Sequence, residues 1–177
     1  MIISVEKARE LVDLEGWTDA KIRWKLLSIE QIIRAYTNNN FQDRGFRIRA
    51  DIRGGVFMSE SLIPFEEGDT IQVGETQYNN ELFTVYEVTD DTTFTVEESV
   101  HDEDDVLVTK VVYPADVQDC VINLLDWEIH NRKKVGIQSE TLSRHSVTYF
   151  NLDASNQVMG YPASLLGCLK PYRKVRF

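Results

Sequence analysis

Apolar residues recur at helical spacing near both ends of the chain. The clearest run follows Thr18, a candidate N-cap, and extends to about Tyr36. Its apolar side chains are separated alternately by four and three residues, as on the buried face of a helix: Ile22, Leu26, Ile29, Ile33 and Tyr36. Three further helices are predicted at residues 4–14, 114–134 and 162–170, the first with Ser4 as its candidate N-cap and the last ended by Pro171.

Between these helices the apolar pattern changes to a period of two. Apolar and charged residues alternate strictly from Phe46 to Arg53, which predicts a strand with one buried and one charged face. Asn79-Asn80 and Asp90-Asp91 are turn signals between further predicted strands. Those strands lie at residues 70–73, 82–88, 92–97 and 106–112, and a strand or extended arm is predicted at 146–150.

The order of these elements predicts an α+β fold. The simplest assembly is a small helical bundle formed by both ends of the chain, with a small antiparallel β-sheet or barrel inserted between the second and third helices. Residues 1–43 and 113–177 would form the helical domain, and residues 44–112 would form an inserted acidic β subdomain. A chain of 177 residues is long enough for one domain with such an insertion.

Composition excludes two broad classes of protein. With 42% hydrophobic and 27% charged residues, the chain is neither disordered nor a membrane protein, and no apolar run approaches the ~18 residues that a membrane-spanning helix needs. The first residues lack the basic and apolar regions of a secretory signal, so none is expected. Cys120 and Cys168 fall in apolar helical patterns, so we expect buried thiols in a reducing compartment rather than a bridge or a redox pair.

Charge is distributed unevenly along the chain. The net charge is −10, yet residues 54–109 contain 15 acids and no Lys or Arg. The other residues hold all 19 bases and the remaining 14 acids, a net of +5. The acidic stretch is either a solvated insertion or a surface that repels a nearby polyanion, such as DNA moving through a channel. Direct DNA binding through it is disfavoured because phosphate recognition needs Lys and Arg.

The sequence contains no recognisable catalytic or metal-binding motif. His101 stands in an acidic run that lacks the spacing and the glycine of a calcium loop. His130 is expected to interact with the C-terminal end of its helix, and His145 has no nucleophile elbow around its neighbouring serines. Phosphate loops, dinucleotide fingerprints and Cys-x-x-Cys pairs do not occur either. We therefore expect a protein that is not an enzyme and uses no cofactor or metal.

Two basic features remain. One is the charged face of the first predicted strand, for which a solvated surface is the simplest interpretation: Arg44, Arg47, Arg49 and Arg53. The other is the end of the chain, residues 172–177, where Tyr and Phe flank three cations. Aromatic residues and Arg are enriched where proteins dock on proteins. This end is interpreted either as a docking peptide or as a frayed terminus.

Two stretches of sequence say more about the class of protein than the composition does. The first joins Tyr113-Pro114-Ala115-Asp116-Val117 to the run from Leu124 to Tyr149, and the second joins Gly160-Tyr161-Pro162 to Leu165 and Leu169-Lys170-Pro171-Tyr172-Arg173-Lys174. In order and spacing they resemble the head–tail connector (head-completion or adaptor) proteins of tailed bacteriophages. The opening helix, break and long helix are similar too, so the resemblance covers about residues 1–40 and 113–177.

The resemblance implies a structural virion protein without catalytic activity or cofactor. Its protomers would form a homo-oligomeric ring at the head–tail junction, made in the bacterial host cytoplasm. That ring would dock under the portal protein, extend the DNA channel without sequence-specific DNA binding or any membrane contact, and meet the next tail-side connector or stopper protein. The acidic β insertion departs from compact members of the family.

The resemblance also implies two sets of site residues. The extended segment after the long helix implies ring-interface candidates, which are Ser139, Glu140, Arg144, Tyr149 and Phe150. The end of the chain implies portal-docking candidates, which are Tyr172, Arg173, Lys174, Arg176 and Phe177.

A soluble, non-enzymatic binding module is the alternative function. Its β insertion would recognise a peptide or ligand through an exposed aromatic groove formed by Phe83, Tyr86 and Phe94. Strand alternation puts Phe83 and Tyr86 on opposite faces, which favours an ordinary core instead.

Overall fold

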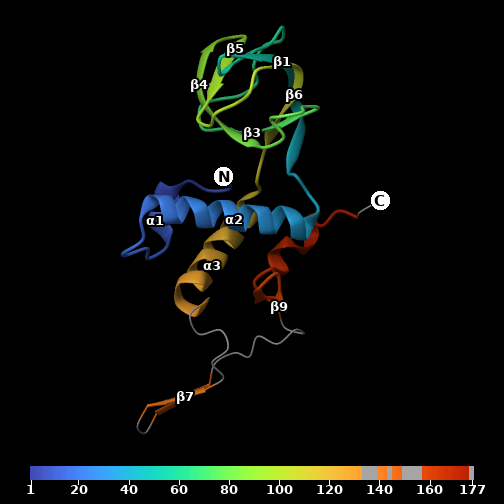
Figure 1. The fold of residues 1–177 in the computed structure, drawn as a ribbon. Coiled ribbons are helices and arrows are strands. Elements are labelled where there is room, and N and C mark those ends of the chain that lie inside the picture. The colour runs from blue at the N-terminus through green and yellow to red at the C-terminus, as the bar shows by residue number, and fades with distance from the viewer. Residues whose placement is uncertain (133–138, 143–144, 149–156, 176–177) are drawn as a thin grey trace. The chain divides into compact units, whose positions relative to one another are not determined.

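A computed structural model describes residues 1–132, 139–142, 145–148 and 157–175 (Figure 1). The chain divides into two compact units. Met1–Asn39 and Tyr113–Phe177 belong to the first, which we call the terminal unit, and Asn40–Val112 form the second, the barrel unit. Both ends of the chain therefore belong to one unit, which the barrel unit interrupts once.

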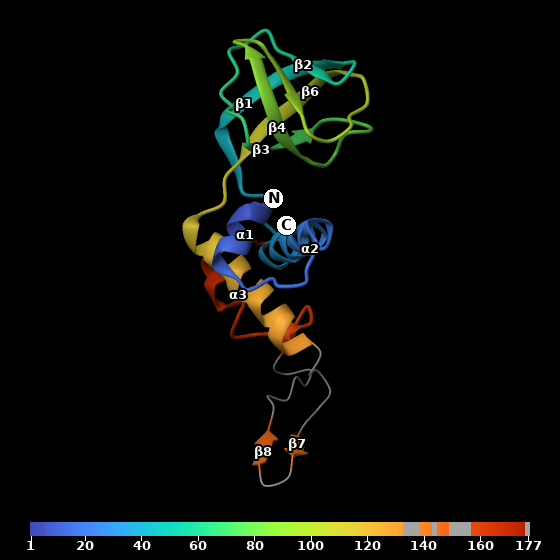
Figure 2. The same cartoon turned by 90° about the vertical axis from the view of Figure 1, so that its left-hand side faces the viewer.

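The barrel unit is a closed barrel of six antiparallel strands (Figure 2). The strands are β1 (Gln42–Arg53), β2 (Val56–Met58), β3 (Thr70–Gly74), β4 (Leu82–Asp90), β5 (Thr93–Val96) and β6 (Glu103–Val111). Their order around the barrel is β1-β2-β5-β4-β3-β6, and β6 closes it by pairing with both β1 and β3. Closure leaves no unpaired edge strand in this sheet.

The alternation in the sequence explains which face of each strand is buried. In β1, Ile48, Ala50 and Ile52 point into the barrel while Arg49, Asp51 and Arg53 stay exposed. The same rule buries Phe83 and Val85 on β4. The core is completed by Phe57, Phe65, Ile71, Val73, Phe94, Val106 and Val108.

The predicted fold class is wrong. The structure is mostly sheet, with a closed six-stranded barrel as its largest regular element and few helices, and it is not a helical bundle formed by both chain ends. One reason is that the barrel needs a strand the pattern did not show, because β2 has only three residues and follows Gly54-Gly55 directly. Another is that β1, with 12 residues, begins before the strict alternation does. Periodicity identifies elements one at a time and says little about whether a sheet closes on itself.

Three helices are described in the terminal unit: α1 (Val5–Leu11), α2 (Asp19–Thr37) and α3 (Ala115–Asn131). The predicted N-caps are confirmed, since Ser4 Oγ accepts from Lys7 N at 3.1 Å and Thr18 Oγ1 accepts from Lys21 N at 3.3 Å. α3 begins one residue later than predicted, with Pro114 as its N-cap. The apolar faces of α2 and α3 pack together, and α2 also contacts α1.

The end of the chain differs from the prediction in two ways. The predicted α-helix at 162–170 is instead a 3-10 helix, η2 (Gly167–Tyr172), and Pro171 lies inside it rather than ending it. The predicted buried thiols are also wrong, because Cys120 of α3 and Cys168 of η2 form a disulfide with their Cα atoms 6.5 Å apart. Cys120 is buried, but Cys168 is exposed. Two cysteines 48 residues apart carry no sign in the sequence that the fold brings them together.

Two short hairpins lie between α3 and η2. β7 (Ser139–Leu142) pairs with β8 (His145–Thr148), and β9 (Gln157–Val158) pairs with β10 (Tyr161–Pro162), each pair forming a separate two-stranded sheet. β8 overlaps the strand predicted at 146–150, whose last two residues lie outside the described part of the chain.

Candidate functional site

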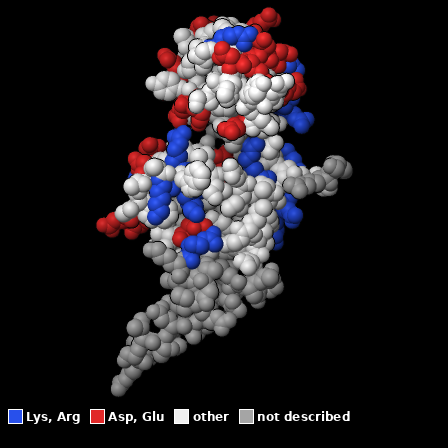
Figure 3. All heavy atoms as spheres, viewed as in Figure 1, with Lys and Arg blue, Asp and Glu red and all other residues white. Residues whose placement is uncertain are grey.

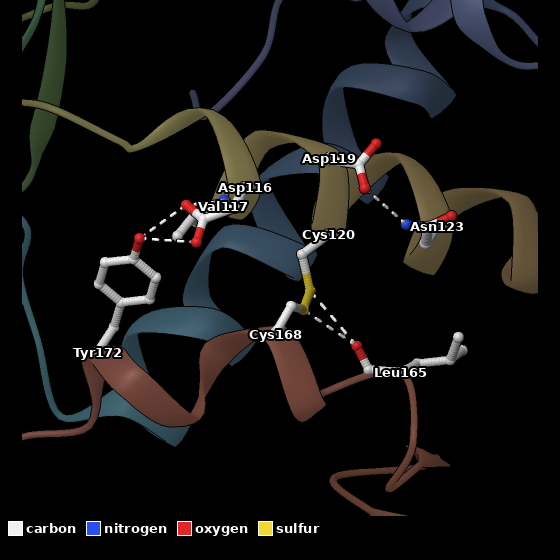
Figure 4. Close-up of a disulfide and its surroundings, with 8 residues drawn as sticks. All are labelled: Asp116, Val117, Asp119, Cys120, Asn123, Leu165, Cys168 and Tyr172. Carbon is white, nitrogen blue, oxygen red and sulfur yellow. Dashed lines mark hydrogen bonds between the residues drawn. A yellow bond between two sulfur atoms is a disulfide. The ribbon is translucent and has the colours of Figure 1, made fainter.

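The C-terminal segment, Gly167–Val175, is attached to α3 at two points (Figure 4). The disulfide joins it to the second turn of α3, and both sulfur atoms lie within 3.4 Å of the Leu165 carbonyl oxygen. Later in the segment, the Tyr172 hydroxyl donates to the Asp116 carboxylate in the first turn of α3, and the hydroxyl oxygen lies 2.7 Å from each carboxylate oxygen. This hydrogen bond is the main cause that raises the pKa of Tyr172.

The same segment is attached to the C-terminal end of α2. Lys174 N donates to the Thr37 carbonyl at 2.7 Å, which satisfies one of the free carbonyls of that helix end. The Asn39 amide donates to the Tyr172 carbonyl at 3.2 Å. The Arg173 guanidinium carbon lies 5.1 Å from the centroid of the Tyr36 ring, a cation–π contact. Gly167–Val175 is therefore an ordered part of the terminal unit and not a frayed end.

These contacts leave part of the predicted docking set exposed. Arg173 and Lys174 of that set are exposed, and so is Val175, which was not predicted and has 73% of its surface accessible. Tyr172 is half-buried, and its hydroxyl group is used within the chain. Arg176 and Phe177 lie outside the described residues. The structure thus brings Tyr172, Arg173 and Lys174 together on the ends of α2 and α3.

The predicted ring-interface residues fall on or beside the β7–β8 hairpin. Ser139 is paired with Thr148 and Glu140 with Val147. Arg144, Tyr149 and Phe150 lie outside the described residues. The backbone of Ser139 and Glu140 is therefore in a strand, and the pairing of that strand is with β8.

A buried charged cluster was not anticipated from the sequence. Glu128 of α3 is 6% exposed, and its carboxylate accepts from Lys25 Nζ of α2 at 3.1 Å and from Arg132 Nε at 3.0 Å. The Arg132 guanidinium carbon lies 4.8 and 5.0 Å from the ring centroids of Trp127 and Tyr161, and these two centroids are 5.4 Å apart. The only advance sign was a Glu four residues before an Arg near the helix end. We call Lys25, Trp127, Glu128, Arg132 and Tyr161 the Glu128 cluster.

The Glu128 cluster holds the end of α3 against the β9–β10 turn. Arg132 Nη1 donates to the Gly160 carbonyl at 2.9 Å, and Gly160 itself has a φ of +80°, a conformation suited to glycine. Burial alone would raise the pKa of Glu128, but hydrogen bonds from Arg132, Tyr161 and Lys25 and the charge of Lys25 lower it to about 2. The cluster therefore joins two segments of the described chain, the C-terminal end of α3 and the β9–β10 turn, that are separated in sequence by residues 133–156.

A Glu128→Gln variant tests the electrostatic role of this cluster. A carboxyl whose pKa is lowered by folding stabilises the fold at pH values above its pKa in the unfolded chain, which is 4.5. This stabilisation is lost as the pH falls through its pKa in the folded protein, about 2. The variant should lose about 1–3 kcal/mol of unfolding free energy at pH 7, and its deficit relative to wild type should shrink between pH 4.5 and 2. Urea unfolding at several pH values measures this difference. Glu15→Gln, at an exposed acid of the same unit, is the control, and a deficit independent of pH would contradict the ionic explanation.

A second buried acid lies on α2. Glu30 is 2% exposed and accepts a hydrogen bond of 2.6 Å from the Tyr113 hydroxyl, while the Met1 amino group lies 3.8 Å from its other oxygen. Burial is the main cause that raises the pKa of Tyr113, and the charge of Glu30 adds to it. These groups join the first residues, α2 and the start of α3 within the terminal unit.

Two of the four arginines on the basic face of β1 are paired with acids of the barrel unit. Arg49 pairs with Glu75 at 2.6 Å and with Asp105 at 3.1 Å, and Arg53 pairs with Asp104. The Arg47 side chain donates to Thr109 at 3.0 Å, whereas Arg44 is exposed. Part of the acidic stretch is thus neutralised within the barrel itself.

His101 and His130 each make contacts within their own unit. His101 contacts the Tyr78 ring with centroids 5.8 Å apart, and His130 Nδ1 lies 3.0 Å from the Asp126 carbonyl oxygen in the last turn of α3. The part of the chain that the structure describes contains no group of three or more His, Cys, Asp or Glu that could hold a metal ion. In the same residues, no helix combines the length and the apolar character needed to cross a membrane.

Comparison with known proteins adds nothing to the resemblance, which rests on the sequence motifs alone. No model of a known protein family matches the chain, and no curated protein is significantly similar to it.

Proposed function

We propose that this protein is a structural subunit of the head–tail connector ring of a tailed bacteriophage. It would dock under the portal, extend the DNA channel and join the capsid to the tail. The observation that carries the proposal is the C-terminal segment, which is held on the ends of α2 and α3 while the Arg173, Lys174 and Val175 side chains remain exposed. The motifs that resemble connector proteins lie in the same unit.

An ordered segment is a better docking element than a free one. A disordered peptide loses conformational freedom when it binds, whereas a segment already held in place loses little. Here the Tyr172–Asp116 hydrogen bond and the Lys174–Thr37 hydrogen bond fix the backbone beforehand. The side chains that remain exposed include two cations, which suits an acidic surface on the portal.

The β7–β8 hairpin supports assembly into a ring. A hairpin that forms a two-stranded sheet by itself is marginally stable in water. Among the described residues no third strand pairs with either of its edges. Pairing or packing with a neighbouring copy would satisfy those edges, and Ser139 and Glu140 on β7 would belong to that contact. A ring needs such a contact between different surfaces of successive copies.

The acidic barrel unit is compatible with passage of DNA. Asn40–Val112 contains 17 acids and 5 bases, so its net charge is −12. A surface of that sign repels phosphates and would let DNA pass without being held. We propose that part of this unit faces the channel or the tail side.

The alternative binding module lacks the feature it requires. Phe83 and Phe94 are 3% and 0% exposed and lie in the barrel core, and Tyr86 alone of the three is exposed. These side chains therefore do not line a common groove.

Phage assembly provides the test of the proposed function. In a phage that encodes this chain, an amber codon early in its gene should give DNA-filled heads that do not join tails in a non-suppressing host. Purified chain added to that lysate should restore infectious particles. Complete particles from the amber mutant would show that the protein has another function.

The docking segment is tested in the same assay. Lys174→Glu should lower the restoration about tenfold or more, because it reverses an exposed cation in the proposed contact. The Lys174 contacts that we describe are made by its backbone, so the fold should be unaffected. Arg44→Glu, at an exposed base of the barrel unit, is the control. Equal restoration by wild type and Lys174→Glu would remove this segment from the portal contact.

A further inference from the structure

An exposed apolar patch lies on α2. Trp24 has 76% of its surface accessible and Leu27 has 36%, and the two are three residues apart on one face of the helix. Lys21 and Gln31 are also exposed and flank them on that face. We call Lys21, Trp24, Leu27 and Gln31 the α2 patch. Tryptophan is usually well covered in a folded protein, and it is the residue type most enriched among interface hot spots.

The exposed charge of the α2 patch is the positive charge of Lys21. The other bases of the helix, Arg23, Lys25 and Arg34, are partly buried, Lys25 is paired with Glu128, and the single acid after Asp19, Glu30, is buried. Asp19, at the helix start, is paired with Arg9 at 2.5 Å. Figure 3 shows Lys and Arg side chains over the terminal unit and mainly Asp and Glu over the barrel unit. A partner for the α2 patch should therefore be acidic and should offer an apolar or aromatic side chain.

The barrel unit has a patch of that kind. Tyr86 on β4 is 60% exposed, and the next residue, Glu87, is exposed too, because the β4–β5 register shifts between Val85 and Glu87. Gly68 N donates to the Val85 carbonyl at 2.9 Å, which places the loop that carries Glu66 and Glu67 beside the same stretch of β4. We call Glu66, Glu67, Tyr86 and Glu87 the barrel patch. Its three acids are exposed, and the described residues offer their carboxylates no ion pair.

We propose that the α2 patch of one copy binds the barrel patch of the next copy. A cationic surface with a central Trp would then meet an anionic surface with a central Tyr. The two patches lie on different units of the chain, so the contact is heterologous and can be repeated from copy to copy. This inference deepens the proposed ring, but it concerns the contact between copies and does not depend on what the ring docks on.

The charges of the two patches favour this pairing over the pairing of two identical patches. Residues 54–109 contain no base, so two barrel patches repel each other, and two α2 patches do the same. Only the unlike pair is attractive. Because the charges lie at the surface, the attraction should weaken as salt rises from 50 to about 500 mM, where the screening length falls from roughly 14 to 4 Å.

Sedimentation velocity and carbodiimide cross-linking of the full chain at 50 mM salt test the proposal. Carbodiimide forms a covalent amide bond between a lysine and a carboxylate that are in direct contact. It therefore also detects weak complexes that form only briefly. We expect cross-links between Lys21 and Glu66, Glu67 or Glu87 that increase with protein concentration and fade in high salt. Cross-links that do not depend on concentration would place the contact within one chain, and their absence at high concentration and low salt would exclude it. Either result overturns the proposal.

Charge reversal separates this contact from a general loss of folding. Lys21→Glu alone, and Glu66→Lys with Glu67→Lys, should each weaken association about tenfold. Combined in one chain they should recover most of the wild-type association, since the signs are opposite again. Glu60→Lys with Glu81→Lys, at two exposed acids outside the barrel patch, is the matched control and should have little effect. No recovery in the combined variant would contradict the pairing.

A mixing experiment tests that the contact is heterologous. Chains with Trp24→Ala keep an intact barrel patch, and chains with Glu66→Lys and Glu67→Lys keep an intact α2 patch. At a concentration at which wild type assembles and the weakened variants do not, neither variant should assemble alone, whereas an equimolar mixture should stop at a one-to-one dimer with one intact contact. Larger assemblies in the mixture would contradict the proposal. This experiment and the amber assay have independent outcomes. If the patches do not bind but the chain restores phage assembly, only the proposed contact is wrong. If the patches bind but the chain does not restore phage assembly, only the proposed phage function is wrong.

Discussion

Reduction of the Cys120–Cys168 disulfide is expected to lower the unfolding free energy of the terminal unit by about 4 kcal/mol, if the 48-residue separation is treated as a loop-closure entropy. The bond joins α3 to η2, so its loss frees the C-terminal segment in the unfolded chain and removes one of its attachments in the folded one. Urea unfolding followed by tryptophan emission measures the change. Trp17, Trp24 and Trp127 all belong to the terminal unit, so this emission reports on that unit.

A double variant provides the control for reduction. Cys120→Ala with Cys168→Ala should resemble the reduced protein and should not respond to reductant. Its midpoint in urea should fall together with that of reduced wild type. If wild type and the double variant unfold at the same urea concentration without reductant, the disulfide does not form in solution and the expectation of two thiols is restored.

The disulfide also bears on the proposed place of assembly. A bacterial cytoplasm keeps most thiols reduced, whereas the released particle meets an oxidising medium. The proposed docking segment would then be held during assembly by the Tyr172 and Lys174 hydrogen bonds, and the covalent link would follow later. Cys168 is exposed, so a soluble oxidant or reductant can reach it.

The sequence predicted local structure well where a single side chain, or the apolar pattern of a single strand, determines that structure. Thr18 and Ser4 cap the helices that follow them, as expected, because a short hydroxyl side chain can accept from a free helix N–H. Phe46–Arg53 is part of β1 because strict alternation suits a sheet with one buried face. Both signals act within a few residues, so they do not depend on the rest of the fold.

Features that depend on distant parts of the chain were not predictable in this way. β2 is three residues long and is stabilised by β1 and β5 on its two sides, not by its own sequence. Glu128 and Glu30 are buried because Lys25, Arg132 and Tyr113 meet them in the folded unit. η2 contains Pro171, which usually ends an α-helix, and the contacts of Tyr172 and Leu169 hold that turn in place. In each case tertiary contacts outweigh the local preference.

The candidate site shows the same division. The grouping of three cations between Tyr172 and Phe177 was visible in the sequence. That the Tyr172 hydroxyl binds Asp116, 56 residues away, was not visible, and this contact separates an ordered segment from a frayed end. The exposure of Trp24 was not visible either, because a helical apolar pattern does not show which of its neighbouring apolar residues stay uncovered.

Phe94→Ala should destabilise the barrel unit by about 3–5 kcal/mol, the usual range for a fully buried phenylalanine. Phe94 is 0% exposed and lies at the centre of the barrel core. Its ring stacks on Phe57 with centroids 4.7 Å apart and meets Phe65 edge-on at 5.6 Å. Truncation removes both ring contacts and leaves a cavity in a closed barrel, whose strands are paired on both sides and cannot easily move inward.

Amide hydrogen exchange locates this loss. The barrel unit contains no tryptophan, so exchange of its backbone amides, resolved by peptide, has to report on it. We expect faster exchange throughout β1–β6 in Phe94→Ala, while tryptophan emission still reports the wild-type midpoint for the terminal unit. Phe46→Ala, at a residue that is 44% exposed, is the matched control and should change exchange little. A shift of the tryptophan midpoint equal to the barrel's loss would show that the two units unfold together, because each would then depend on the core of the other for its stability.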